Sequence, residues 1–505
     1  MKTKFLVFLV LAGIIIPNLL FPQFSQQGPK LVGTGEVNGS SQGLSVAISS
    51  DGNTAVVGGG YDNNYFGATW VFTRSGGVWT QQGQKLVGTG SIGFPWQGSS
   101  VAVSGDGNTI VVGGPIDNAT NGAVWIFTRS GNVWTQQGSK LVGTGAVGAA
   151  GQGWSVGISS DGNTVIVGGY KDNNNAGAAW IFSRSGSVWT QQGTKLVGTG
   201  AIGTIIYQGY SVSISSDGNT ALVGGYGDNT SAGAVWVFTR SGGVWTQQGT
   251  KLIGTGAVGN SWQGVSVSIS SDGNTIAEGG NYDNGYKGAT WIFTRSGGVW
   301  TQQGSKLYGT GAAGNPFEGG AVALNSNGNA LIVGGTYDSL GTGAVWIFTR
   351  GGGVWTQSGT KLVGTGAVGG AYQGYSVAIS SNGSTAIEGG FSDNLSTGAA
   401  WVFINPSIGI TTISIEIPEK FSLSQNYPNP FNPSTNIRYE LPKNGFVKLV
   451  VFDELGREIE TLVNEKQTAG TYEATFDASK FSSGIYFYKL QTENFSETKK
   501  MILIK

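Results

Sequence analysis

Two glutamates are the first candidates for chemistry in this chain. Glu278 and Glu388 each occupy a strand position that is held by valine in five equivalent segments, at Val57, Val112, Val167, Val223 and Val333. Two carboxylates can act as the acid and the base of glycoside hydrolysis. A glutamate among apolar residues must otherwise find water or a partner. Nothing in the sequence brings the two together, so we expect solvated positions beside a central channel.

The residue types that are missing limit the chemistry further. The chain of 505 residues contains no histidine and no cysteine. A Ser-His-Asp triad, a disulfide, an iron–sulfur cluster and a thiol nucleophile are therefore excluded. We expect no catalytic residues, no metal and no cofactor.

Two sets of candidate binding residues recur along the chain. One aspartate lies in each of seven polar loops, at Asp62, Asp117, Asp172, Asp228, Asp283, Asp338 and Asp393. Aromatic residues recur in a second variable segment, at Trp96, Tyr207, Trp262, Phe317 and Tyr372. Polar groups can bind sugar hydroxyls, and exposed rings can stack on sugar rings. Alternatively, each aspartate caps its own loop through the backbone. The regular repetition of the aspartates favours this alternative, whereas the irregular aromatic residues are the better binding candidates.

These residues belong to a repeat of about 55 residues. Its G-A-x-W-[VI]-F motif places tryptophan at Trp70, Trp125, Trp180, Trp236, Trp291, Trp346 and Trp401. A repeat of this length made only of strand-like segments is typical of a four-stranded β-propeller blade. The sequence therefore predicts an all-β protein whose main part, residues 24–403, is a seven-bladed β-propeller.

The second repeat illustrates the predicted blade. We expect strands at 99–104, 109–112, 123–129 and 133–142, with an Asp-Gly hairpin turn between the first two. In the third strand Ala123, Trp125 and Phe127 alternate with residues of the opposite face. Because a blade is covered on both faces by its neighbours, these large side chains should fill the space between blades.

The frame of the repeat predicts how the ring closes. The segment 24–31 resembles a fourth strand, and the last repeat stops after its third strand at Phe403. The N-terminal segment should therefore complete the last blade. The segments that vary most between repeats, the crossover into the first strand and the loop after the second, should share one face. This variation suggests a recognition face.

Other features of the main part carry less information. The formal net charge is zero, so nothing indicates nucleic acid or an anionic membrane surface as a partner. The motif G-x-G-x-x-G at 143–148 lacks the following helix that a dinucleotide site needs. Residues 1–23 have the basic start and apolar stretch of a secretory signal peptide. A membrane anchor is the alternative for this segment, and no other segment could span a membrane.

The repeats resemble bacterial FG-GAP proteins, relatives of the integrin α-subunit propeller. The resemblance rests on segments such as 208–225 and 233–249 and covers all seven copies. It implies a propeller used for extracellular recognition and adhesion. The Phe-Gly of the family is mostly Gln-Gly here, as at Gln42-Gly43. The family's calcium loops carry several carboxylates, whereas the turns here carry one, so calcium is not expected.

The C-terminal part differs in composition. Residues 421–505 carry 20 of the chain's 56 charged residues and follow a linker at 404–420. Their segments 427–435, 470–472, 484–486 and 499–505 resemble the C-terminal sorting domain of type IX secretion substrates. The resemblance implies a small antiparallel β-sandwich that the type IX export machinery recognises. An adhesive Ig-like module is the alternative.

Together these observations predict a protein that is secreted or held at the outer cell surface after passing through the periplasm. We expect a monomeric propeller that recognises an extracellular carbohydrate, a surface polymer or a protein. The alternatives are a propeller-fold polysaccharide lyase or glycoside hydrolase, and a structural component of a surface layer. The enzyme alternative requires a compact acid/base cluster in the channel or on the variable face.

Overall fold

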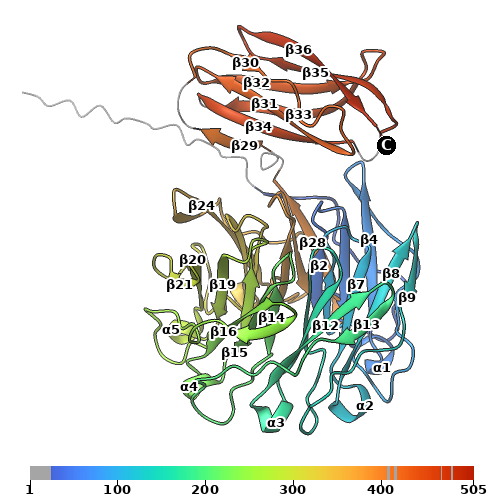
Figure 1. Ribbon diagram of the computed structural model, residues 1–505, viewed down its shortest axis with the longest axis vertical. Coiled ribbons are helices and arrows are strands. Elements are labelled where there is room, and N and C mark those ends of the chain that lie inside the picture. The colour runs from blue at the N-terminus through green and yellow to red at the C-terminus, as the bar shows by residue number, and fades with distance from the viewer. Residues whose placement is uncertain (1–23, 406–409, 415–417, 468, 479–480, 505) are drawn as a thin grey trace, which may run out of the picture.

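The structure is a computed structural model that describes residues 24–405, 410–414, 418–467, 469–478 and 481–504. The predicted signal peptide lies outside the described residues. The chain forms a ring of seven four-stranded antiparallel sheets and a separate pair of sheets at the C-terminus (Figure 1). The predicted all-β fold, a seven-bladed propeller followed by a small sandwich, is confirmed.

Each of the first six blades consists of four strands in sequence order, with a short turn labelled as a helix between the second and third. Blades 1 to 3 comprise β2 (Ser45–Ile48), β3 (Thr54–Gly59), α1 (Asp62–Tyr65), β4 (Ala68–Ser75), β5 (Val78–Gln81), β6 (Ser100–Val103), β7 (Thr109–Gly114), α2 (Asp117–Thr120), β8 (Ala123–Ser130), β9 (Val133–Gln136), β10 (Ser155–Ile158), β11 (Thr164–Gly169), α3 (Asp172–Asn175), β12 (Ala178–Ser185) and β13 (Val188–Gln191). Blades 4 to 6 comprise β14 (Ser211–Ile214), β15 (Thr220–Gly225), α4 (Asp228–Ser231), β16 (Ala234–Ser241), β17 (Val244–Gln247), β18 (Ser266–Ile269), β19 (Thr275–Gly280), α5 (Asp283–Tyr286), β20 (Ala289–Ser296), β21 (Val299–Gln302), β22 (Ala321–Leu324), β23 (Ala330–Gly335), α6 (Asp338–Gly341), β24 (Ala344–Gly351) and β25 (Val354–Gln357).

The seventh blade joins the two ends of the ring. It contains β26 (Ser376–Ile379), β27 (Thr385–Gly390), α7 (Asp393–Ser396), β28 (Ala399–Ile404) and, as its outer strand, β1 (Ser25–Gln26). β1 pairs with β28 in the register Ser25 to Ile404 and Gln26 to Phe403. The ring therefore closes through the N-terminal segment, as the split repeat predicts.

A second closure lies around the central channel. One residue of each blade, two positions after the end of the first strand, forms this closure. Its backbone N–H donates to the carbonyl oxygen of the equivalent residue in another blade, with N···O distances of 2.9–3.2 Å. The circle runs through Ser50, Gly105, Ser160, Ser216, Ser271, Ser326 and Ser381 and returns to Ser50. All seven innermost strands are thereby linked at this end of the channel.

The core lies between the blades. The seven framework tryptophans are fully buried. In β8, Ala123, Trp125 and Phe127 pack into one inter-blade cluster, while Val124 and Ile126 pack into the next. This confirms the predicted alternation. The fourth strand, β9, is shorter than predicted. The chain leaves the ladder after Gln137, whose N–H still donates to Ile126 O, and pairs with β8 again at Leu141.

The C-terminal sandwich has two four-stranded sheets. One has the order β29 (Ile410–Ser414), β34 (Gly470–Asp477), β31 (Ser434–Leu441) and β30 (Ser422–Leu423). The other has the order β33 (Glu458–Gln467), β32 (Gly445–Phe452), β35 (Gly484–Gln491) and β36 (Ser496–Leu503). β29 lies within the segment that the sequence suggested as linker, and it pairs with β34.

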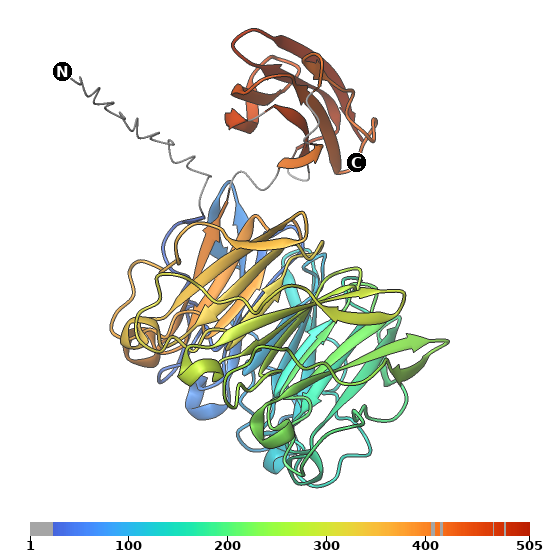
Figure 2. The same ribbon diagram turned by 90° about the vertical axis from the view of Figure 1, so that its left-hand side faces the viewer.

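The two faces of the propeller carry different connections between strands. The crossovers into the first strands and the turns α1 to α7 lie on one face, which we call the variable face. The hairpins that follow the first and third strands lie on the other, the hairpin face. β28 ends at the hairpin face, so the chain leaves the ring on that side. In Figures 1 and 2 the turns α1 to α5 accordingly lie on the side of the propeller away from the sandwich.

Candidate functional site

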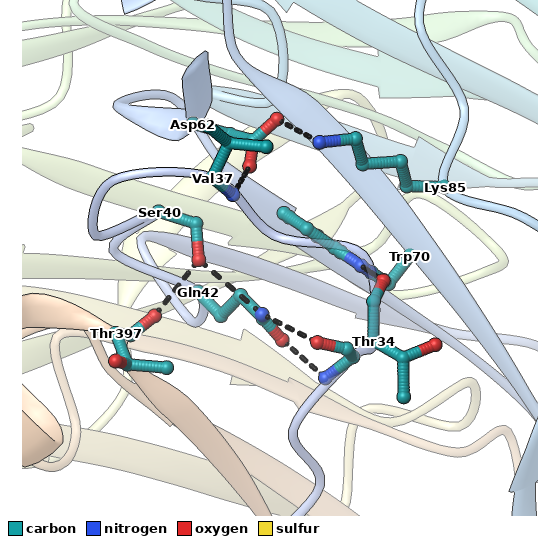
Figure 3. Close-up of polar contacts among 9 residues, drawn as sticks. Thr34, Val37, Ser40, Gln42, Asp62, Trp70, Lys85 and Thr397 are labelled. Atoms are coloured by element: carbon teal, nitrogen blue, oxygen red, sulfur yellow. Dashed lines mark hydrogen bonds and ion pairs between the residues drawn. The ribbon is translucent and has the colours of Figure 1, made fainter. Parts of the chain in front are cut away.

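The seven predicted aspartates are framework residues. Asp62 is 1% exposed, its Oδ1 accepts the Val37 N–H at 2.8 Å, and its Oδ2 pairs with Lys85 Nζ at 2.5 Å (Figure 3). Every blade repeats this arrangement, through the pairs Asp117–Lys140, Asp172–Lys195, Asp228–Lys251, Asp283–Lys306, Asp338–Lys361 and Asp393–Lys30. The carboxylates hold the crossover to the turn and lie beneath the surface, so they do not extend the candidate ligand surface. The sequence suggested that each aspartate caps the backbone of its own loop. Instead, the carboxylate bonds to a lysine and to a backbone N–H of the crossover.

The turn that follows each aspartate is left-handed. In α1, Asn63, Asn64 and Tyr65 have φ values of 50°, 55° and 71°. Successive left-handed residues are costly for side chains with a Cβ, and asparagine tolerates them best. The turn persists because Gly67 N donates to Asp62 O and because Trp96 N and Gln97 N of the next crossover donate to Tyr65 O and Phe66 O.

The glutamine of each Gln-Gly pair fixes the crossover from below. Gln42 Oε1 accepts the Gly33 N–H at 2.5 Å and Gln42 Nε2 donates to Gly33 O at 3.0 Å (Figure 3). Gly33 must lack a side chain, because a Cβ there would lie 2.0 Å from the Trp70 ring. The Gln42 amide therefore has a structural role here, since it clamps the backbone of Gly33 from both sides of the peptide.

Glu318 takes the place of that glutamine in blade 6. Its Oε2 accepts the Gly309 N–H at 2.5 Å. Burial raises the pKa of Glu318 to about 8, against the opposing effect of this N–H. The protonated carboxyl can donate to the glycine carbonyl as the amide does elsewhere, whereas the carboxylate cannot.

The five predicted aromatic residues lie on the variable face and share an unusual backbone conformation. Trp96, Tyr207, Trp262, Phe317 and Tyr372 have φ values of 57–61° and are half-buried. Ser41 and Gly151 hold the same position in blades 1 and 3. A bulky residue in the left-handed region costs about 1–3 kcal/mol and often marks a functional site.

Ring contacts join four of these residues to others in one continuous belt. We call it the aromatic belt; in order of contact it consists of Trp154, Tyr170, Tyr207, Tyr226, Trp262, Tyr282, Phe317, Tyr337, Tyr372, Phe391 and Tyr375. The tightest contact is between Trp262 and Tyr282, whose ring centroids are 3.6 Å apart. Trp96 belongs to a separate group with Tyr61 and Tyr65.

The belt runs from blade 3 to blade 7 along one side of a pocket on the propeller axis. The pocket has a volume of about 280 Å³, and every blade contributes to its wall. The residue after each Gln-Gly or Glu-Gly pair faces it, namely Leu44, Ser99, Trp154, Tyr210, Val265, Gly320 and Tyr375. Burial raises the pKa values of Tyr210 and Tyr375 further above the ordinary value near 10.

The sequence analysis missed these axial residues and the belt members Tyr170, Tyr226 and Phe391. A signal was present. The position after Gln-Gly differs in almost every repeat although its neighbours barely change, and so does the position after the Gly-Gly that ends each second strand. The predicted aromatic binding residues came only from the crossover into the first strand, so these two variable positions were left out.

Glu278 and Glu388 are not solvated, so the expected channel-side position is wrong. Both side chains are fully buried, and among the described residues their carboxyl oxygens have no hydrogen-bond partner. Burial raises both pKa values well above the usual range. The nearby Gly254 and Gly364 N–H groups oppose this shift less strongly, because they donate their hydrogen bonds to Gln263 and Gln373 instead. The residues lie in β19 and β27, two blades apart, where they pair in register with Trp291 and Trp401. They belong to separate blade cores and not to one acid pair.

Metal-binding groups and membrane-spanning helices are the remaining features that bear on function. Within the described ranges, no three His, Cys, Asp or Glu residues are grouped so that they could hold a metal ion. No helix in the described part of the chain is long and apolar enough to cross a membrane.

The C-terminal part of the chain has a recognisable family. Residues 425–505 match the family described as secretion system C-terminal sorting domain. The chain thus carries a type IX sorting domain and is exported to the cell surface or secreted. No curated protein matches the chain significantly.

The solved structures that resemble the chain do so distantly. The periplasmic gluconolactonase PpgL of Pseudomonas aeruginosa is 15% identical with a TM-score of 0.41, covering 64% of this chain and 85% of that one. The β-propeller domain of the Trilobed protease from Pyrococcus furiosus is 8% identical with a TM-score of 0.36, covering 72% and 94%. Prolyl oligopeptidase B from Galerina marginata is 10% identical with a TM-score of 0.38, covering 89% and 55%.

Proposed function

We propose that the propeller is an extracellular recognition module of the FG-GAP, integrin-like kind that binds a carbohydrate, a surface polymer or a protein through its variable face. One observation carries the proposal. Five aromatic side chains are held there at left-handed backbone positions that glycine and serine fill in two other blades. Strain of this kind is retained where the side chain has a use.

The surroundings support binding through this face. Leu340 and Leu395, at the tips of α6 and α7, are 99% and 96% exposed and also have positive φ values. Tyr286, in α5, and Tyr337, which directly precedes α6, are also exposed. Clustered aromatic and aliphatic side chains with polar groups between them are typical of surfaces that bind partners.

The proposal also fits the path of the chain. The sorting domain follows β28, which ends at the hairpin face. The variable face therefore stays open to a ligand while the tail engages the export machinery. The enzyme alternative has less support, because no carboxylate lines the axial pocket and the two unusual glutamates lie in separate blade cores.

An array of glycans and extracellular matrix proteins, probed with the mature chain, tests the proposal. A variant with Trp96, Trp262 and Tyr372 replaced by glycine should lose the array signals. Glycine is the matched choice because Gly151 fills the same position in blade 3 with a φ of 65°. The control variant, Val133→Ser with Val188→Ser, changes exposed residues near the hairpin face and should keep them. Equal signals from both variants would contradict the proposal.

A further inference from the structure

We propose that the axial pocket binds the terminal residue of an uncharged saccharide chain. This inference rests on the proposed function and assigns one ligand class to one part of the variable face. It begins from the asymmetry of the pocket. The ring repeats one sequence seven times, yet the axial position carries Leu, Ser, Trp, Tyr, Val, Gly and Tyr in turn. Six different residue types at seven equivalent positions suit a ligand that itself has no sevenfold symmetry.

The chemistry of the wall selects the class of ligand. Trp154, Tyr210 and Tyr375 supply rings, and Ser99, Asn281 and Thr336 supply neutral hydrogen-bonding groups. Among the residues that the structure describes, no lysine, arginine, aspartate or glutamate lines the pocket. A sugar ring presents apolar C–H faces and several hydroxyls, which match such a wall. An anionic sugar, a phosphate or a charged peptide end would lose its hydration without gaining a counter-charge.

One polar group in the wall is left without a hydrogen bond by the described part of the chain. Asn281 Oδ1 is buried and accepts no hydrogen bond from the residues that the structure describes. A buried amide oxygen without a donor has lost its hydration and gained nothing in exchange, which destabilises the empty pocket. A ligand hydroxyl could donate to this oxygen and remove that cost. The hydroxyls of Tyr210 and Tyr375, which also line the pocket, can both donate and accept hydrogen bonds.

Size and depth limit what can enter. The volume of about 280 Å³ lies at the small end of ligand pockets. Deeper in the channel the wall consists almost entirely of Val, Ile and Ala from the first strands, such as Val101, Val156 and Ile214. Hydroxyls would find few partners there. The pocket therefore suits one terminal sugar, with the rest of the chain lying over the aromatic belt.

Gly320 offers a way to fill the pocket without disturbing the belt. It holds the same repeat position as Tyr210 and Tyr375, and an added Cβ would come no closer than 3.4 Å to another atom. Gly320→Tyr should therefore fold and occupy the pocket with a ring. Ser99→Tyr is a second plug from another blade. Val147→Tyr, at an exposed crossover position, adds a tyrosine to the variable face outside the pocket and is the matched control.

The test is a calorimetric titration of the mature full-length chain with the methyl glycosides of glucose, galactose, mannose and N-acetylglucosamine. Glucuronic acid and leucine amide serve as an anionic and a peptide-like probe. We expect saturable binding of at least one neutral glycoside, a loss of tenfold or more in affinity with each plug, and unchanged binding with Val147→Tyr. Thermal melts check that each variant is folded.

Three results would overturn the pocket assignment. They are tighter binding of glucuronic acid or leucine amide, unchanged affinity in both plugged variants, and no binding of any neutral glycoside. In each case the variant with Trp96, Trp262 and Tyr372 replaced by glycine shows whether only the pocket assignment fails or the proposed function fails too. If that variant loses its array signals, recognition by the variable face stands and only the pocket is wrongly assigned. If it keeps them, both proposals are wrong.

Discussion

Lys30 Nζ lies 2.5 Å from Asp393 Oδ2, although 363 residues separate them in the chain. The same ion pair lies within a single blade in the six other cases, for example between Lys85 and Asp62. The N-terminal segment thus supplies to the seventh blade both an outer strand and the cation that holds its left-handed turn. The contact joins the two ends of the ring at the level of side chains as well as backbone.

Removing that cation should destabilise the propeller. Lys30→Met leaves the buried Asp393 carboxylate without its charge partner, which should cost roughly 3 kcal/mol. Lys195→Met, which breaks the pair with Asp172 inside one blade, should cost a similar amount. Lys287→Met, at an exposed position, is the control and should melt like the wild type. A wild-type melting temperature for Lys30→Met would show that the closure does not depend on this pair.

The stability of the propeller should depend on pH through Glu318. Its pKa is about 8 in the folded protein and near 4.5 when unfolded, so the folded state binds more protons between these values. The contribution of the protonated side chain is fully present below pH 4.5 and is lost as the pH rises towards and through 8. Glu318→Gln should stabilise the protein by roughly 3 kcal/mol at pH 7 and hardly at all at pH 4.5.

Chemical denaturation of both proteins at several pH values measures this effect. Gln97→Glu in blade 2 is the reciprocal variant and should introduce a second dependence of the same sign. Parallel stability curves for the wild type and Glu318→Gln across this range would contradict the assigned role of the carboxyl.

Glu278 and Glu388 should be replaceable by valine with a gain in stability. Each variant removes a buried acid without a hydrogen-bond partner and introduces the residue of five other blades. The gain should be about 1–3 kcal/mol each, and it should grow as the pH rises, because both pKa values are raised in the folded state. Val223→Glu in blade 4 is the converse control and should destabilise. Loss of ligand binding in either valine variant, with the fold intact, would show a functional role instead.

Export should depend on the C-terminal domain. Deletion of residues 421–505, which include the matched sorting domain, should leave the propeller in the periplasm. Cell fractionation with an antibody against the propeller measures the distribution. Tyr472→Ala, which opens the sandwich core, should have the same effect if recognition needs the folded domain. Normal amounts of the truncated protein outside the cell would contradict the role of the tail.

The architecture was predictable from the sequence for physical reasons. Each blade must bury both faces, so Trp125 and its equivalents recur with little variation, and their spacing gives the size and number of the blades. The split between segment 24–31 and Phe403 predicted the closing strand because the third strand of each of the other blades pairs with a fourth-strand segment. These features depend on the repeat alone.

The candidate site was only partly predictable. Asp62 and Lys85 are 23 residues apart, and neither residue's position reveals that a left-handed turn brings them together beneath the surface. Ser99, Gly320 and Tyr375 converge on the axis only because the ring closes, and a single repeat does not show this. Glu278 is buried because the packing of the whole blade outweighs the cost of burying one carboxyl group. No local sequence pattern indicates this burial.

The position of the aromatic side chains can be tested through stability. Trp262 is half-buried and strained at a φ of 60°, so Trp262→Gly loses packing but relieves the backbone, and the net change should stay within about 2 kcal/mol. Trp236 is fully buried, and Trp236→Ala should cost roughly 3–5 kcal/mol. Thermal and denaturant melts of the two variants give the comparison. Equal losses would place Trp262 in the core rather than on a ligand surface.

The most direct test of the account is the affinity of the folded Trp262→Gly variant for the glycan or protein that the wild-type chain binds on the array. If the variable face is the ligand surface, the dissociation constant should rise at least tenfold while the melting curve stays close to that of the wild type, since a few aromatic anchors dominate most interfaces. The Val133→Ser and Val188→Ser variant, changed near the hairpin face, should bind like the wild type. Unchanged affinity for Trp262→Gly together with loss of binding in that control would contradict the account and place recognition on the opposite face.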